Sequence, residues 1–208
     1  VNEFPELQGL MGAEYARIAG ENPHVVKGIL EHYLPRAAGD DLPATKPGIV
    51  VGLSDKIDTI TACFGIGIVP TGSQDPYALR RQAAGIVQVI LELDVPLSLD
   101  TLMSAALDEL EAHHKLTRPR VEVERELAHF FQLRIKHILQ TRHVRYDVID
   151  AVLKSGVSLP QQVVAKAELL MKRIEQPSFK RTVEAFTRVE NLAVKAAGEF
   201  DSFDETLH

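Results

Sequence analysis

The chain has 208 residues, of which 45% are hydrophobic and 25% charged, and its formal net charge is −6. This composition excludes a disordered tail, a collagen-like rod and a generally basic nucleic-acid binder. The single cysteine, Cys63, excludes an internal disulfide and fits a reducing compartment.

No apolar run reaches the ~18 residues that a membrane-spanning helix needs, so we expect no contact with a membrane. The first residues are Val1 and Asn2, with neither an initiator Met nor the pattern of a signal peptide. We therefore expect a piece of a longer chain, located in the cytoplasm.

The hydrophobic pattern of the first half predicts helices, because apolar residues recur on one helical face. The predicted helices cover residues 7–19, 23–32, 48–64 and 76–93. Asn22 before Pro23, and Asp75 before Pro76, are typical of helix starts. The segment 48–64 is the most apolar and is interpreted as a buried helix, although its β-branched residues 49–51 also fit a strand.

The second half continues the helical pattern. The predicted helices cover residues 99–110, 123–139, 146–153, 160–175 and 178–197. Ser98 or Asp100 is expected to cap the first of them. The sequence therefore predicts an all-α fold, with a boundary near Val95–Pro96 between a compact helical bundle (1–95) and an elongated helical segment (96–208).

Several stretches are more specific than a helical pattern. They are EFPELQGLMG (3–12), EHYLP (31–35), GDDLP (39–43), LSDKIDT (53–59) and PTGSQDPYALRR (70–81). In this order and spacing they resemble the β subunit of the bacterial tetrameric (α2β2) glycyl-tRNA synthetase. Three later stretches are similar to the same family: FFQLR (130–134), YDVIDAVL (146–153) and RVENL (188–192).

The resemblance implies an HD-domain-like bundle over 1–95, followed by connecting helices that contact tRNA. The family's C-terminal anticodon-binding domain is expected to be absent. The implied function is to bind and position tRNA(Gly) for ATP-dependent glycylation in the active site of the α subunit. ATP and Mg²⁺ are expected there, and this chain is expected to hold no cofactor and no catalytic residue.

HD-domain phosphohydrolases bind divalent metal through His and Asp ligands, and His32 and Asp55 resemble two of them. The sequence contains no His-Asp dipeptide, so we expect no metal; if one binds, these two residues are the candidate ligands. The favoured alternative is structural, because carboxylates near basic residues usually form ion pairs. The candidate pairs join Asp55 and Asp58 to Lys56, Arg80 or Arg81.

Basic residues crowd one segment of the second half. Local Lys and Arg clusters bind RNA backbones even on acidic proteins, so this segment is the predicted tRNA surface. The candidate RNA-binding residues are Arg118, Arg120, Arg134, Lys136, Arg142 and Arg145. The structural alternative is that cations near a helix C-terminus stabilise its dipole.

Two other functions remain open from the sequence. One is an HD-type metal-dependent phosphohydrolase, which the missing His-Asp dipeptide disfavours. The other is a structural module that docks the subunits, and the stretch 70–81 fits docking as well as RNA contact.

Overall fold

The computed structural model describes residues 3–197, and within them it contains helices and no β-strand. The helices are η1 (Pro5–Leu7), α1 (Leu10–Ile18), α2 (Pro23–Glu31), α3 (Lys46–Gly65), α4 (Leu79–Glu92), α5 (Leu99–Ala112), α6 (Arg120–Thr141), α7 (Tyr146–Lys154), α8 (Pro160–Arg173) and α9 (Pro177–Ala197). The predicted all-α fold is confirmed, whereas the likeness to HD domains stays a prediction. No described helix is both long and apolar enough to cross a membrane.

Short polar side chains begin several helices. The Asn22 side chain accepts a hydrogen bond from the backbone N–H of His24 (2.9 Å), and the Ser98 hydroxyl accepts one from Thr101 (3.3 Å). These caps satisfy N–H groups that lack a partner in the first helical turn. The helix starts predicted at Asn22 and Ser98 are therefore confirmed.

The start of α4 differs from the prediction. Pro76 lies in a turn, Ala78 takes a left-handed conformation (φ 53°), and the helix begins only at Leu79. The Asp75 carboxylate still accepts the backbone N–H groups of Leu79 (2.7 Å) and Arg80 (3.0 Å). Asp75 thus caps α4 from outside the helix, because the turn at Ala78 brings its side chain back to the first helical turn.

A continuous core joins α3, α4, α5 and α6. Residues 49–51 lie within α3, so the strand alternative for them is wrong. Half of α3 is buried, including Ile60 and Phe64. On α6, Phe131 and Ile135 are fully buried in the same core. The long α3 and α6 therefore form the framework on which the shorter helices pack.

The core also runs across the predicted boundary near Val95–Pro96. The backbone N–H of Leu99 donates to the Ser158 carbonyl (2.8 Å), and the Gln161 side chain donates to the carbonyls of Ile90 (3.2 Å) and Val95 (2.7 Å). Helix α8 packs on α4 as well as on α7. The division of the chain at this point stays a prediction.

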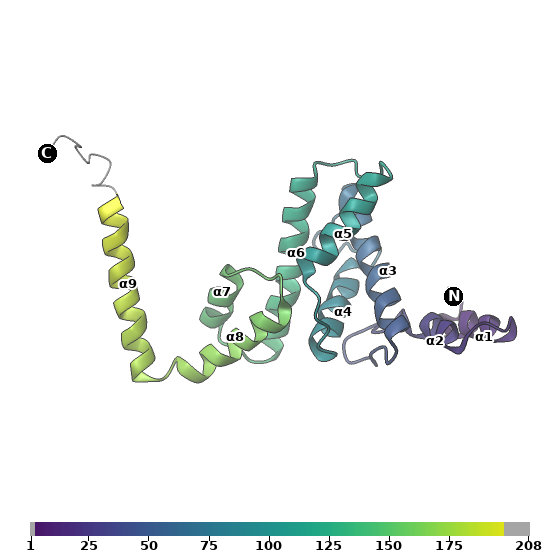
Figure 1. Cartoon of the computed structure of the whole chain (residues 1–208), viewed down its shortest axis with the longest axis horizontal. Coiled ribbons are helices and arrows are strands. Elements are labelled where there is room, and N and C mark those ends of the chain that lie inside the picture. Colours follow the sequence, from purple (N-terminus) through teal and green to yellow (C-terminus); the bar gives the residue numbers. More distant parts are fainter. Residues whose placement is uncertain (1–2, 198–208) are drawn as a thin grey trace, which may run out of the picture.

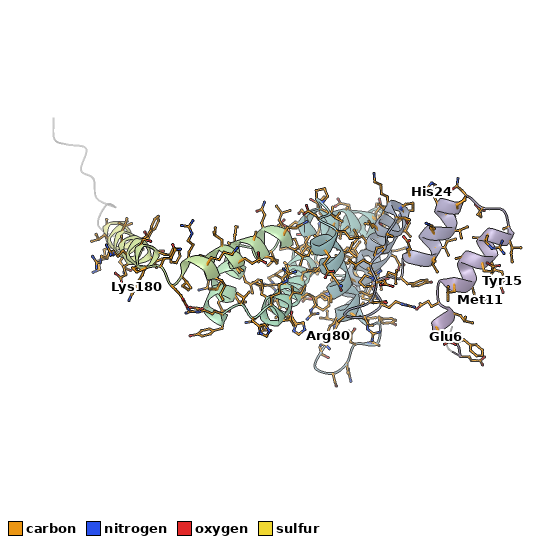
Figure 2. All side chains as sticks on the ribbon, turned by 90° about the horizontal axis from the view of Figure 1, so that it is seen from below. Glu6, Met11, Tyr15, His24, Arg80 and Lys180 are labelled. Atoms are coloured by element: carbon orange, nitrogen blue, oxygen red, sulfur yellow. The ribbon has the colours of Figure 1, made fainter. Side chains whose placement is uncertain are left out.

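The two ends of the molecule differ from its middle (Figure 1). The α1–α2 hairpin projects at one end and reaches the core through α2, while α9 stands apart at the other end. None of the α9 side chains that the structure describes is buried, and Phe186 is 75% exposed. Figure 2 shows Lys180 on this separate helix and Tyr15 on the outer side of the hairpin.

Candidate nucleic-acid interface

The basic residues at the N-terminal end of α6 are bound by carboxylates of the protein. Both terminal nitrogens of Arg118 donate to Glu126 (2.9 and 2.7 Å), and one also donates to the Phe64 carbonyl (3.1 Å). The hydrogen bond from Arg118 lowers the pKa of Glu126. Arg118 therefore ties α6 to the end of α3, and its guanidinium is not free for RNA.

Arg120 is bound still more extensively. It donates to Glu124 (2.7 Å), Asp108 (2.6 Å) and Glu111 (2.6 Å), and also to the Ser104 hydroxyl (3.0 Å). These hydrogen bonds raise the pKa of Arg120. Because Asp108 and Glu111 lie on α5, Arg120 joins α5 to α6. RNA contact through Arg118 and Arg120 stays a prediction, which these hydrogen bonds disfavour.

The basic residues near the C-terminal end of α6 have weaker partners. Lys136 lies 3.6 Å from Asp150, and Arg142 lies 3.5 Å from Glu168. Both cations are more than 40% exposed. Arg145, at the start of α7, has a closer exposed partner in Asp147 (2.8 Å). The pairs of Lys136 and Arg142 are long and exposed and contribute little stability, so these two cations can exchange a carboxylate for a phosphate. Arg145, in contrast, donates two hydrogen bonds to Asp147 (3.2 and 2.8 Å).

Arg134 has a different environment from the other predicted residues. Its guanidinium carbon lies 4.4 Å from the centre of the Phe130 ring, and its Nη1 atom is buried without a hydrogen-bond partner among the described residues. Burial, together with the nearby charge of Arg80, lowers the pKa of Arg134. The half-buried guanidinium of Arg134 thus packs on the face of the Phe130 ring. Direct RNA contact through Arg134 stays a prediction.

A hollow of the described surface lies between the 35–39 loop, α4 and the last turns of α6. Its volume is about 290 Å³, and Arg81, His137 and Arg142 all line it. Pro35 and Gly85 form part of its wall, and a Cβ added to Gly85 would come within 3.4 Å of Pro35. This cationic hollow combines small apolar surfaces with three groups suited to an anion.

The sequence predicted an ion pair for Arg81 and did not predict that Arg81 lines the cationic hollow. A signal was present, because Arg80 and Arg81 occupy the first turn of α4, where the helix dipole disfavours cations. Figure 2 shows Arg80 at the lower edge of the central helices in that view, away from both ends of the molecule. Two arginines at such a position indicate a role other than helix stability.

The ion pairs predicted for Asp55, Asp58, Arg80 and Arg81 are absent from the described residues. The expected partner Lys56 is instead buried, and its ammonium donates to backbone carbonyls of His32 (2.7 Å), Leu34 (3.1 Å) and Gly52 (3.4 Å). Burial lowers the pKa of Lys56. This lysine therefore fixes the end of α2 and the following loop against α3.

The two candidate metal ligands do not share a hollow. Asp55 lines a second hollow of about 270 Å³ together with Lys56 and Arg81, whereas His32 lines a separate apolar hollow between α2 and α3. The His32 ring lies against Tyr33, with a centroid distance of 3.8 Å, and its Nδ1 is 2.8 Å from the Ile29 carbonyl oxygen. Within residues 3–197, no group of three or more His, Cys, Asp or Glu side chains is placed to hold a metal ion.

The known proteins that this chain is similar to belong to one family. The family model described as glycyl-tRNA synthetase beta subunit matches residues 1–154. The glycine–tRNA ligase beta subunit of Halalkalibacterium halodurans is 56% identical over 94% of this chain, and that of Bacillus subtilis is 44% identical over 94%. This chain covers only 28% and 27% of those two proteins. The chain belongs to the glycyl-tRNA synthetase β-subunit family.

Proposed function

We propose that this chain is the part of a cytoplasmic glycine–tRNA ligase that binds tRNA(Gly) and positions it for glycylation. The reaction itself would use ATP and Mg²⁺ in the active site of a partner α subunit. The described residues would supply electrostatic contact and shape, with no catalytic side chain of their own.

The observation that carries this proposal is the convergence of Arg81, His137 and Arg142 on one hollow. These residues come from two helices that the core holds rigidly side by side. Arg81 forms no ion pair within the described residues, and the partner of Arg142 is 3.5 Å away. Glu92 is the only carboxylate lining the hollow, so positive charge prevails there. Such a surface suits RNA phosphates on a protein whose total charge is negative.

Lys136 extends this positive surface along α6, whereas RNA contact through Arg145 stays a prediction because Asp147 already accepts two hydrogen bonds from it. Exposed side chains at helix ends reach furthest into solvent, where a phosphate backbone approaches. The RNA surface that we propose is therefore narrower than the one expected from the sequence, and it gains Arg81 on α4 and His137 on α6. Its members are Arg81, Lys136, His137 and Arg142.

The experiment is binding of tRNA(Gly) to the 208-residue chain across a salt series. We expect binding that weakens steeply with salt, because each phosphate contact adds about 0.9 to the slope for a duplex. The double variant Arg81→Ala with Arg142→Ala should lower the slope by about 2. The absence of binding at low salt would overturn the proposal.

A second candidate function is docking of another protein surface, since apolar side chains are exposed at both ends of the molecule. Phe186 and Leu192 on α9 are 75% and 66% exposed, and Tyr15 and Ile18 on α1 are 64% and 68% exposed. Large apolar side chains that gather on an exposed face mark interaction sites. Docking and tRNA binding would use different faces, so the two functions are compatible.

A further inference from the structure

The cationic hollow has a neighbour that shares part of its wall. The first hollow lies between the 35–39 loop, α4 and α6, and the second lies between the Tyr33 region, α3 and the start of α4. Pro35 and Arg81 line both. Since Arg81 is exposed and forms no ion pair within the described residues, its guanidinium stands free at the junction.

Each hollow is small and mixed in character. Their volumes, about 290 and 270 Å³, lie near the lower limit for small-ligand sites of about 300 Å³. In the first hollow, Gln88 and Thr141 add hydrogen-bonding groups to a wall of small apolar residues. In the second, Thr59 and Gln82 lie beside Tyr33, Pro35 and Ala78, in a lining that also holds charged residues. Walls that combine apolar surface with amide and hydroxyl groups suit the face and edge of a nucleobase.

We propose that the two hollows bind two successive unpaired nucleotides of an RNA, with the phosphate that links them held by Arg81. Arg142 and His137 would hold the next phosphate at the far rim of the first hollow. A duplex cannot enter these hollows, because its bases are stacked and paired, whereas an unpaired strand can turn its bases outward. The inference rests on the proposed tRNA-binding function and specifies which form of RNA this face selects.

The second hollow also contains Asp55, whose carboxylate would repel a phosphate. It lies on α3, one residue from Lys56, whose ammonium is directed toward backbone carbonyls. A carboxylate in a base-binding hollow accepts hydrogen bonds from exocyclic amino groups, which cytosine, adenine and guanine carry and uracil lacks. The second hollow is therefore expected to prefer a base with an exocyclic amino group over uracil, which offers the carboxylate only its ring N3–H.

The test compares binding of the 208-residue chain to an unstructured single-stranded RNA and to a blunt-ended RNA duplex with the same total number of nucleotides. We expect the single strand to bind about tenfold more tightly, because each base placed on a protein surface adds affinity that a duplex cannot supply. Arg81→Glu should abolish this preference. Arg173→Glu, an equal charge change on exposed α8 surface, should retain it.

A variant that keeps the charge unchanged separates the effect of the shape of the first hollow on RNA binding from the effect of its charge. Ala84→Leu fills the first hollow, and it should reduce the preference for single strands to less than twofold while the salt slope for tRNA(Gly) stays the same. Ala38→Leu, in the exposed loop on the opposite wall, serves the same purpose if Ala84→Leu fails to fold.

The possible results distinguish the two proposals. Equal affinity for the single strand and the duplex, with tRNA(Gly) still bound, would overturn this inference and leave the proposed function standing. No binding to any of the three RNAs at low salt would overturn both. A preference for single strands that survives both Arg81→Glu and a filled hollow would place the unpaired strand elsewhere and overturn the inference.

Discussion

The two ends of α6 carry similar numbers of basic residues but use them differently. At the N-terminal end, Arg118 and Arg120 are each held by carboxylates at 2.6–2.9 Å. At the C-terminal end, Lys136 and Arg142 have partners only at 3.5–3.6 Å. The first end uses its charges to hold helices together, whereas Lys136 and Arg142 at the second end are only weakly paired. A count of basic residues along a sequence therefore overestimates the surface that can bind a polyanion.

The largest expected effect comes from the N-terminal end. Arg120→Ala should lower the free energy of unfolding by about 1–2 kcal/mol, because Glu124, Asp108 and Glu111 would lose their shared cation and repel one another. Urea denaturation measures the change. The affinity for tRNA(Gly) should remain within twofold of that of the unaltered chain. A large loss of affinity without a loss of stability would contradict the structural role that we assign to the N-terminal end of α6.

Arg134 lies between the two ends of α6. Replacing it measures the free energy that is lost by burying its Nη1 atom without a hydrogen-bond partner. Arg134→Met keeps a long side chain on the Phe130 ring and removes a polar atom that has no partner. We expect the free energy of unfolding to rise by about 1 kcal/mol, since an unsatisfied buried polar group costs that much or more. Thermal denaturation provides the measurement. A marked loss of stability would mean that Nη1 is satisfied in solution by water.

Lys136 should show the behaviour of the C-terminal end. Lys136→Ala should weaken tRNA(Gly) binding severalfold at low salt and reduce the salt slope by about 1. The melting temperature should not change measurably, because the pair with Asp150 is long and exposed. Arg125→Ala, an exposed position near the other end of α6, is the matched control and should leave the slope unchanged.

The smallest effect concerns acid stability at the N-terminal end. The pKa of Glu126 in the folded chain lies below its usual 4.5 because Arg118 donates to it. The unfolded chain therefore binds the proton first, and the stability that this pair contributes is present above pH 4.5 and is lost as the pH falls further. Glu126→Gln should show a shallower fall in stability below that pH. An acid profile identical to that of the unaltered chain would show that the pair contributes nothing.

The sequence predicted what depends on neighbours along the chain. The caps at Asn22 and Ser98 act on residues two or three positions away, and the helical periodicity of residues 48–64 spans a single element. The start of α4 was wrong because a left-handed residue in the preceding turn delays it. The left-handed backbone conformation of Ala78 leaves no recognisable pattern in the sequence.

The candidate site was harder to predict because it depends on tertiary packing. The carboxylates that bind Arg120 come partly from α5, and those near Lys136 and Arg142 come from α7 and α8. Arg81 meets Arg142 in a hollow only after α4 and α6 pack together. No spacing along the chain reveals which cations these contacts neutralise and which they leave available.

The separation of α9 has a consequence for handling the protein. In the short connection after α8 only Ile174 packs against the core, and basic residues flank the connection on both sides, including Arg173 and Lys180. A brief exposure to trypsin should cut there first, because a protease needs a segment that it can unfold locally. The product would retain α1–α8 with every buried side chain of the core, and would be a well-defined starting point for crystals.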